Sequence, residues 1–297
     1  MPLENEAAFI PFTVLQSDLE RMIDVALAED LAMGDVTTDS LIHPAWQADG
    51  AMVMKSAGTL AGMPVAEAVF RRVDPSIVFT QRMPDGAAVK ERDVIAEFSG
   101  SARNILRAER LALNYVQRLS GVATLVAQFV EAVRGFPVRV TETRKTTPGL
   151  RSLEKYAVRV GGGHNHRQNL ADGVLIKDNH LEALALAGFG VGDAVRMARA
   201  RAPHTVQIEV EVESFDQLDE AVEAGADWIL LDNMSPAMMA EAVKRVAGRA
   251  KLEASGGITL ETARAVAESG VNLISSGSFT HSYKALDISL ELSYRVQ

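Results

Sequence analysis

Residues 208–276 read IEVEVESFDQLDEAVEAGADWILLDNMSPAMMAEAVKRVAGRAKLEASGGITLETARAVAESGVNLISS, and this stretch decides the fold. Apolar runs suited to buried strands begin at Ile208, Trp228, Lys251 and Asn272, which are 20, 23 and 21 residues apart by subtraction. Helical patterns fill the three intervals, and each ends at a glycine, as helices often do. Strands that alternate with helices at this spacing predict βα units around a parallel sheet.

Two further strand-like runs precede this repeat, at residues 138–143 and 172–177. At least six parallel strands are therefore expected, and this number favours an incomplete (β/α) barrel over a small open sheet. An open, doubly wound α/β sheet remains the alternative. Ser214 and Thr259 stand where they can cap two of the helices.

The first part of the chain has α+β patterning instead. A possible capping box at Ser17 opens an amphipathic helix, short β-like runs follow, and a long helical pattern from Ser101 leads into Gly121. The segment ALDISLEL, which begins at Ala285, reads as one more strand. The expected organisation is a sandwich-like N-terminal α+β domain over residues 1–122, onto which the tail 285–297 can pack back, and a catalytic α/β barrel over residues 123–284.

Composition restricts the class of function. The 297 residues are 47% hydrophobic, carry a net charge of −9 and include no cysteine. An acidic chain lacks the basic footprint of nucleic-acid binding, but a local basic pocket can still hold an anionic small molecule. The absence of cysteine excludes disulfides, thiolate metal sites and a cysteine nucleophile. Residues 1–12 do not resemble a signal peptide and no apolar run could span a bilayer, so a cytoplasmic enzyme is expected.

Barrel enzymes place their active sites at the carboxyl ends of the strands. In this chain the first two predicted strands end in bases, the next two in acids, and the last two in glycine and serine turns. In chain order these ends are Arg144-Lys145, Lys177-Asp178, Glu211, Asp232, Ser255-Gly256-Gly257 and Ser275-Ser276-Gly277-Ser278.

Each kind of strand end has a chemical use. Glycine and serine turns before a helix bind phosphate through backbone N–H groups, paired carboxylates suit Mg²⁺ with its substrate phosphates, and arginine binds carboxylates in a bidentate manner. Arg151, Lys155 and Arg159 could equally form a solvated helix face. Because Arg144, Lys145 and Lys177 close predicted strands, a solvated helix face does not explain them. The pattern predicts a pocket for two anions, a phosphorylated sugar and a carboxylic acid.

The same strand ends belong to longer motifs that resemble the quinolinate phosphoribosyltransferase family. The resemblance covers nearly the whole chain after the first dozen residues, and motifs of this length in this order are specific. They are Glu29-Asp30, GDVTT from Gly34, ERLALN from Glu109, LSGVAT from Leu119, TRKTTPGL from Thr143, EKYA from Glu154, GGGHNHR from Gly161, LIKDNH from Leu175, LDNM from Leu231, EASGGI from Glu253 and Leu286-Asp287.

This resemblance implies transfer of a phosphoribosyl group from phosphoribosyl pyrophosphate (PRPP) to quinolinate, with Mg²⁺ required, by a homodimer with an incomplete barrel. Lys145, Lys177, Glu211 and Asp232 would be the catalytic residues. By motif position, the quinolinate ligands would be Arg110 (across the dimer interface), Arg144, His166, Arg167 and Lys177. The ligands of PRPP would be Lys145, Glu211, Asp232, Ser255, Gly256, Gly257, Ser276, Gly277 and His281, with Glu211 and Asp232 serving Mg²⁺, directly or indirectly.

Three other functions fit parts of the pattern. A related enzyme that uses nicotinate would need to bind only one carboxylate, so the abundance of bases favours the diacid. A Schiff-base aldolase could use Lys177 as its nucleophile, but would leave the arginines unexplained. A non-catalytic binding protein would be expected to lack some of the charged residues of the site, whereas every expected charged residue is present.

Overall fold

A computed structural model of the chain describes residues 11–296 and divides them into two compact units. The N-terminal unit comprises residues 11–127, 147–162 and 282–296, and the C-terminal unit comprises 128–146 and 163–281. Residues 1–10 lie outside the described residues. They include most of the segment 1–12, for which the sequence predicts no signal peptide. Within 11–296, no helix has the length and apolar character needed to cross a membrane.

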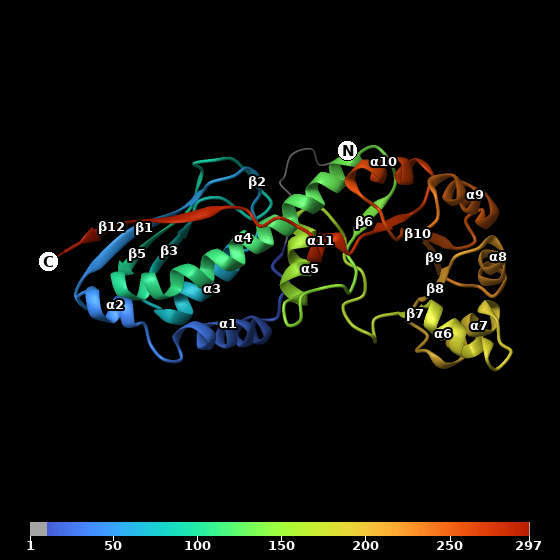
Figure 1. Ribbon diagram of the computed structural model, residues 1–297, viewed down its shortest axis with the longest axis horizontal. Helices are drawn as coiled ribbons and strands as arrows, with labels where there is room; N and C mark the ends of the chain where they lie inside the picture. Colours follow the sequence, from blue (N-terminus) through green and yellow to red (C-terminus); the bar gives the residue numbers. More distant parts are fainter. Residues whose placement is uncertain (1–10, 297) are drawn as a thin grey trace. The chain divides into compact units, whose positions relative to one another are not determined.

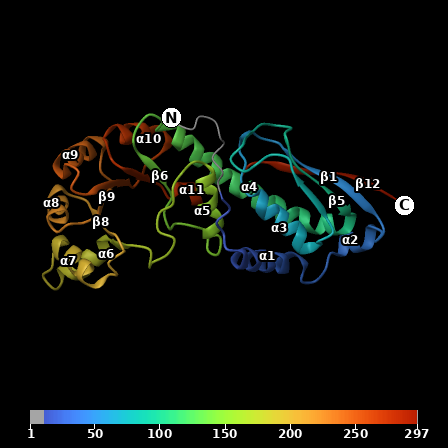
Figure 2. The same ribbon diagram turned by 180° about the vertical axis from the view of Figure 1, so that it is seen from behind.

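The C-terminal unit is built on a six-stranded parallel sheet, labelled in Figure 1 and seen from behind in Figure 2. All six strands expected from the sequence are present, so the mixed α/β fold is confirmed. The strand order is β6-β11-β10-β9-β8-β7. Strands β7 to β11 therefore lie in chain order, and β6 pairs with β11 and not with β7. The strands are β6 (Arg139–Thr141), β7 (Val174–Ile176), β8 (Ile208–Val212), β9 (Trp228–Asp232), β10 (Lys251–Ser255) and β11 (Leu273–Ser275).

Helices alternate with these strands, as the repeat predicts. Gly225, Gly248 and Gly270 follow three of the helices at φ +78°, +79° and +91°, a left-handed conformation that favours glycine. Ser214 caps α8 by accepting a hydrogen bond from the backbone N of Gln217 at 3.3 Å. The helices are α6 (Asp178–Ala185), α7 (Val191–Arg201), α8 (Phe215–Glu223), α9 (Pro236–Val246), α10 (Leu260–Glu268) and α11 (Ser278–His281).

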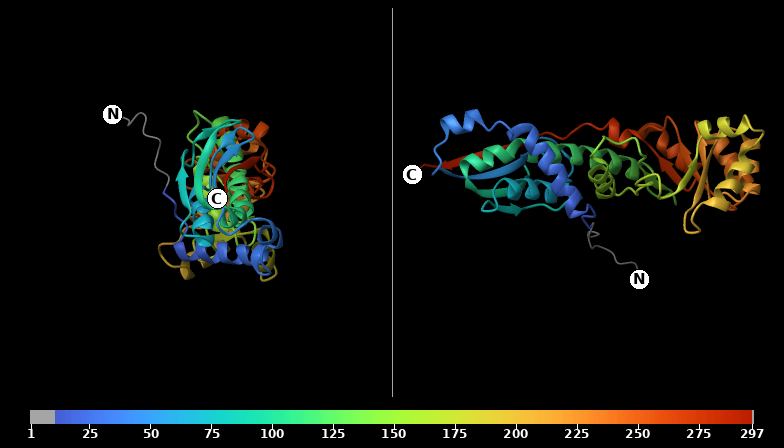
Figure 3. Two further views of the ribbon diagram at one scale, coloured as in Figure 1. Left: turned by 90° about the vertical axis from the view of Figure 1, so that its left-hand side faces the viewer. Right: turned by 90° about the horizontal axis from the view of Figure 1, so that it is seen from below.

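The N-terminal unit contains an antiparallel sheet of order β12-β1-β5-β3 and a two-stranded sheet, β2-β4 (Figures 1 and 3). Its packing includes Phe70 of α3 stacked on Phe98 of β5, with ring centroids 5.0 Å apart. The strands are β1 (Gln47–Met54), β2 (Gly58–Thr59), β3 (Val78–Gln81), β4 (Ala88–Val89), β5 (Val94–Ser101) and β12 (Ile288–Arg295). The helices are α1 (Gln16–Leu31), α2 (Val36–Leu41), α3 (Met63–Val73), α4 (Ala102–Ala132, whose residues 102–127 belong to this unit) and α5 (Arg151–Val160).

One local prediction about this unit is wrong. Helix α1 begins at Gln16 with Leu15 at the N-cap, and no side chain caps it, so Ser17 does not form the expected capping box. The long helical pattern that leads into Gly121 is helix α4, which continues past this glycine to Ala132. A methyl group on Gly121 would lie 2.5 Å from the carbonyl O of Lys284, so this glycine permits close packing of the helix against the chain.

Neither unit is one continuous segment of the sequence. Residues 147–162, which include α5, cluster with the N-terminal unit, and so does β12, which pairs antiparallel with β1. The expected boundary at residue 122 stays a prediction, since a partition by contacts does not define a sequence boundary.

Candidate active site

A cavity of about 610 Å³ opens at the carboxyl ends of the parallel strands in the C-terminal unit. It is lined by ten of the residues predicted for the site: Arg144, Lys145, His166, Arg167, Lys177, Glu211, Asp232, Ser255, Gly256 and Gly257. Thr143, Leu175, Leu230, Asn233, Glu253 and Ser275 complete the lining. Four predicted residues do not line it: Arg110, Ser276, Gly277 and His281. The structure therefore brings the bases, the acids and the first glycine turn together, while their individual roles stay predictions.

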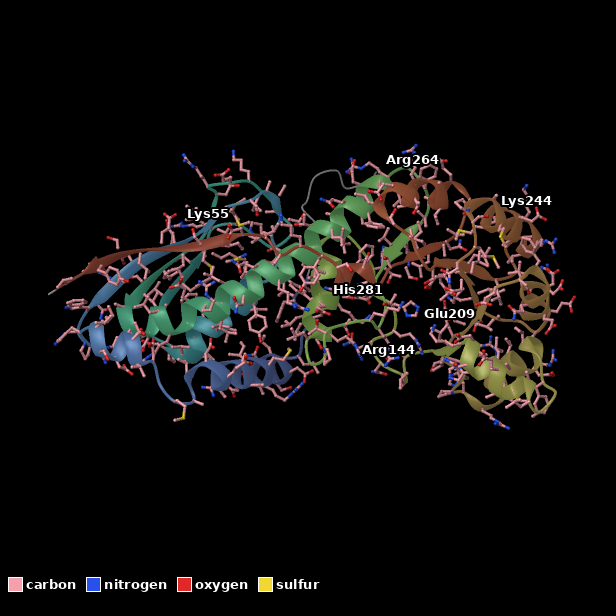
Figure 4. All side chains as sticks on the ribbon, viewed as in Figure 1. Lys55, Arg144, Glu209, Lys244, Arg264 and His281 are labelled. Atoms are coloured by element: carbon pink, nitrogen blue, oxygen red, sulfur yellow. The ribbon has the colours of Figure 1, made fainter. Side chains whose placement is uncertain are left out.

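The basic part of the cavity comes from segments after β6 and β7. Arg144 lies just beyond β6, in the same unit as Glu209 and His281. Figure 4 labels all three side chains. Arg167 is held by a hydrogen bond that its Nη1 donates to the carbonyl O of Gly173 at 3.0 Å. Burial and the nearby Arg144 guanidinium lower the pKa of Arg167, which shows that two cations are held close together. Such a site favours an anionic ligand.

The acidic part of the cavity lies on β8 and β9. The Lys177 ammonium forms an ion pair with Glu211 Oε2, and Asn233 Nδ2 donates to Asp232 Oδ2 at 2.6 Å. Burial and the negative charge of Glu211 raise the pKa of Asp232, against the effect of Lys177. The two carboxylates therefore interact, and together they form an oxygen donor set suited to a hard cation.

The glycine turns close the other part of the cavity. Gly256 and Gly257 have φ of +89° and +62°, and the N–H of Asn233 donates to the carbonyl O of Ser255 at 3.1 Å. After β11, a methyl group on Gly277 would lie 2.8 Å from Lys145 Cδ and 3.0 Å from His281 Nε2. Gly277 and His281 thus lie beside Lys145, although they do not line the cavity themselves.

Buried carboxylates below His166 were not predicted. His166 Nε2 lies 3.4 Å from Glu209 Oε2 and 3.5 Å from Glu253 Oε2. His166 Nδ1 accepts a hydrogen bond from the Arg167 N–H at 2.7 Å. A third carboxylate, Glu142, accepts from the His166 N–H at 3.1 Å. Because residues two apart in a strand share a face, Glu209 could have been found from Glu211 in the run IEVEV.

This cluster retains a proton near neutral pH. Burial opposes a charge on His166, but hydrogen bonds and charges from Glu209 and Glu253 raise its pKa to about 9. Burial, and the nearby Glu253 carboxylate, also raise the pKa of Glu209. Within residues 11–296, His166, Glu209 and Glu253 are the one group of three His, Cys, Asp or Glu side chains whose ligand atoms, all within 4.8 Å of one another, could hold a metal ion. The neighbouring Arg144 and Arg167 disfavour a divalent cation there.

The arrangement of bases, acids and glycine turns has close relatives. A family model described as quinolinate phosphoribosyl transferase, C-terminal domain, matches residues 122–291, and its N-terminal counterpart matches residues 35–120. The chain belongs to the quinolinate phosphoribosyltransferase family.

Individual family members are similar over nearly their whole length. The chain is 42% identical to the probable nicotinate-nucleotide pyrophosphorylase [carboxylating] of Bacillus subtilis, covering 93% of each protein. It is 43% identical to the nicotinate-nucleotide pyrophosphorylase [carboxylating] of Mycobacterium leprae, over 90% of this chain and 94% of that protein. The crystal structure of NadC from Streptococcus pyogenes superposes with a TM-score of 0.90 at 41% identity, over 95% of this chain and 99% of that one.

Proposed function

We propose that this chain transfers the phosphoribosyl group of PRPP to quinolinate, releasing pyrophosphate and CO2 and forming nicotinate mononucleotide, a step of de novo NAD synthesis. Membership of the family and the names of its relatives support this activity. The observation that carries it is the single cavity in which a cluster of cations, two interacting carboxylates and two left-handed glycines meet. A diacid and a phosphorylated sugar match these parts.

The basic part of the cavity binds the diacid. Arg144, Arg167 and Lys177 line this part of the cavity and provide cationic groups, and His166 lies beside them. Quinolinate has two carboxylates, so it uses more of these groups than nicotinate, which has one. Bidentate pairing with arginine fixes the plane of the ring, and this orients the pyridine nitrogen for attack.

The glycine turns and their neighbours bind PRPP. Backbone N–H groups of Ser255, Gly256 and Gly257 receive the 5′-phosphate, together with Ser276, Gly277 and His281 from the segment after β11. Lys145, beside Gly277, neutralises the pyrophosphate. Glu211 and Asp232 hold the ribose.

Glu211 and Asp232 also fit a Mg²⁺ site, because both are carboxylates on adjacent strands and the charge of Glu211 helps to raise the pKa of Asp232. These two carboxylates would hold the ion, directly or through water, together with the substrate phosphates. When bound with PRPP, Mg²⁺ supplies neutralisation of the charge on the leaving pyrophosphate.

The protein contributes position and electrostatics to the reaction. The pyridine nitrogen attacks the anomeric carbon as pyrophosphate leaves, and no covalent enzyme intermediate is needed. The carboxylates of Glu211 and Asp232 stabilise the developing positive charge of the sugar. The C2 carboxylate then leaves as CO2, its electron pair remaining on the ring beside the quaternary nitrogen until C2 takes up a proton.

Arg110 completes the site from the partner subunit of a homodimer. Its side chain is 61% exposed on α4, and its charged neighbour Glu109 is 3.9 Å away, so the guanidinium is accessible to another chain. The family resemblance supports a quinolinate contact for this residue across the interface.

The test is product formation from quinolinate and PRPP with Mg²⁺, beside parallel reactions with nicotinate. We expect nicotinate mononucleotide and CO2 from quinolinate alone. Activity with nicotinate only would contradict the assignment of the basic groups to a diacid. Inactivity with both acids, together with borohydride trapping of a carbonyl substrate on Lys177, would replace the proposal with an aldolase.

A further inference from the structure

Three buried carboxylates adjoin the basic part of the cavity, and the reaction just described does not use them. Glu142 is fully buried, Glu253 is 1% exposed and Glu209 is 8% exposed. Glu142 directly follows β6, Glu253 lies on β10 and Glu209 lies on β8. These strands are alternate members of the order β6-β11-β10-β9-β8. Alternate strands of a barrel contribute side chains to one interior layer, which explains why the three acids converge.

Glu142 holds the backbone of the segment that carries two cations of the site. Its Oε1 accepts from the His166 N–H at 3.1 Å, and its Oε2 accepts from Asn165 Nδ2 at 3.0 Å. The same segment is tied to β6 by the His164 N–H, which donates to the Val140 carbonyl O at 2.8 Å. Hydrogen bonds to both oxygens of a buried carboxylate fix the position of this loop.

Glu209 and Glu253 hold the ring of His166 from below, through Nε2. On its other side the ring accepts from the Arg167 N–H at 2.7 Å. The ring therefore links two strands of the sheet to the backbone of Arg167, whose guanidinium lines the cavity. Displacing this ring would displace Arg167.

We propose that Glu142, Glu209 and Glu253 are positioning residues that set the orientation of His166 and Arg167 for binding the diacid. The proposal rests on the proposed function, because it assigns these acids to the quinolinate half of the same site. Of the three, Glu253 lines the cavity, whereas Glu142 and Glu209 do not. All three act as hydrogen-bond acceptors that keep His166 and Arg167 in place.

The test compares isosteric amide variants. In Glu142→Gln one amide N–H of the new side chain faces a donor, either the His166 N–H or Asn165 Nδ2, so at least one hydrogen bond is lost. Glu253→Gln weakens the support of the His166 ring. We expect the KM for quinolinate to rise about tenfold or more in both variants, as for loss of a hydrogen bond to a charged group, while the KM for PRPP stays within about twofold.

Asp227→Asn is the matched control. Asp227 accepts from the Ile208 N–H and from Arg199 Nη2, both at 2.7 Å, at the opposite end of the same sheet. The Asp227→Asn substitution makes the same chemical change to a hydrogen-bonded carboxylate, and Asp227 does not line the cavity. Thermal unfolding of all three variants measures their loss of stability, and if Glu142→Gln does not fold, Asn165→Ala removes one of the two hydrogen bonds and keeps the carboxylate.

The outcomes separate the proposal from the function on which it rests. Folded variants with an unchanged KM for quinolinate, or with equal increases in both KM values, overturn the positioning role. A wild-type chain that forms no nicotinate mononucleotide overturns the proposed function instead. An increase confined to quinolinate in the cavity variants, absent from Asp227→Asn, supports the proposal.

Discussion

Replacing Gly256 with alanine perturbs the glycine turn through one identifiable contact. Gly256 has φ +89°, and a methyl group there would lie 2.2 Å from Asn233 Oδ1 and 3.0 Å from Asn233 N. The left-handed backbone costs alanine about 1–2 kcal/mol. The contact also forces the Asn233 side chain away from Asp232, to which its Nδ2 donates at 2.6 Å.

The magnitude follows from the lost hydrogen bond. A hydrogen bond to a charged group contributes about 1.5–3 kcal/mol, and each 1.4 kcal/mol corresponds to about a tenfold change. Because Asp232 is proposed to hold the ribose, we expect kcat/KM for PRPP to fall roughly ten- to hundredfold. Steady-state kinetics with quinolinate saturating and PRPP varied measures this change.

A matched control isolates the contact from the backbone strain. Gly225 has a similar φ of +78°, but no atom lies within 4 Å of a methyl group placed there. Gly225→Ala should lose about 1–2 kcal/mol of unfolding free energy, measured by urea denaturation, and keep its activity. If Gly256→Ala keeps the kcat/KM of Gly225→Ala, the assignment of this turn and of Asp232 to the PRPP half of the site is refuted.

Three further predictions concern the dimer, the buried proton and a buried ion pair. Mixing Arg110→Ala with Lys177→Ala subunits should restore about a quarter of wild-type activity, because half of random dimers are mixed and each holds one complete site; no recovery would contradict a shared site. The pKa of His166 is raised from 6.5 to about 9, so its stabilising contribution is complete below pH 6.5 and is lost as the pH rises through 9; urea midpoints of wild type and His166→Gln should converge over that range, and a constant difference would argue against it. Glu154 is fully buried and paired with Arg118, so Glu154→Ala should cost about 3–5 kcal/mol of unfolding free energy, and a loss below about 1 kcal/mol by denaturation would show that the pair is not effectively buried.

Much of the C-terminal unit could be predicted from the sequence, because its βα units are local and regular. Each strand there is one apolar run, and glycines such as Gly248 end the helices. The cavity residues that follow strands, such as Glu211 and Asp232, could be found for the same reason, since parallel strands bring their carboxyl ends to one edge. His166 and Arg167 were assigned to the site only by the family resemblance.

The features that could not be predicted depend on distant contacts. Gly121 lies within helix α4, and only the approach of the Lys284 carbonyl O shows why a glycine stands there. Glu142 and Glu253 look like ordinary polar positions until alternate strands bring them together beneath His166. The sequence pattern of one strand does not show which side chains from other strands share its layer in the interior of the sheet.

The pairing of β12 with β1 has a consequence for the order of events during protein synthesis. The two strands are neighbours in the sheet, yet nearly the whole chain separates Met54 from Ile288. On the ribosome, the edge of β1 stays open until residues 288–295 have emerged. The parallel sheet needs nothing beyond β11, which ends at Ser275. The unit that begins the chain is therefore the last to be completed, the reverse of the usual N-terminal-first order of domain folding.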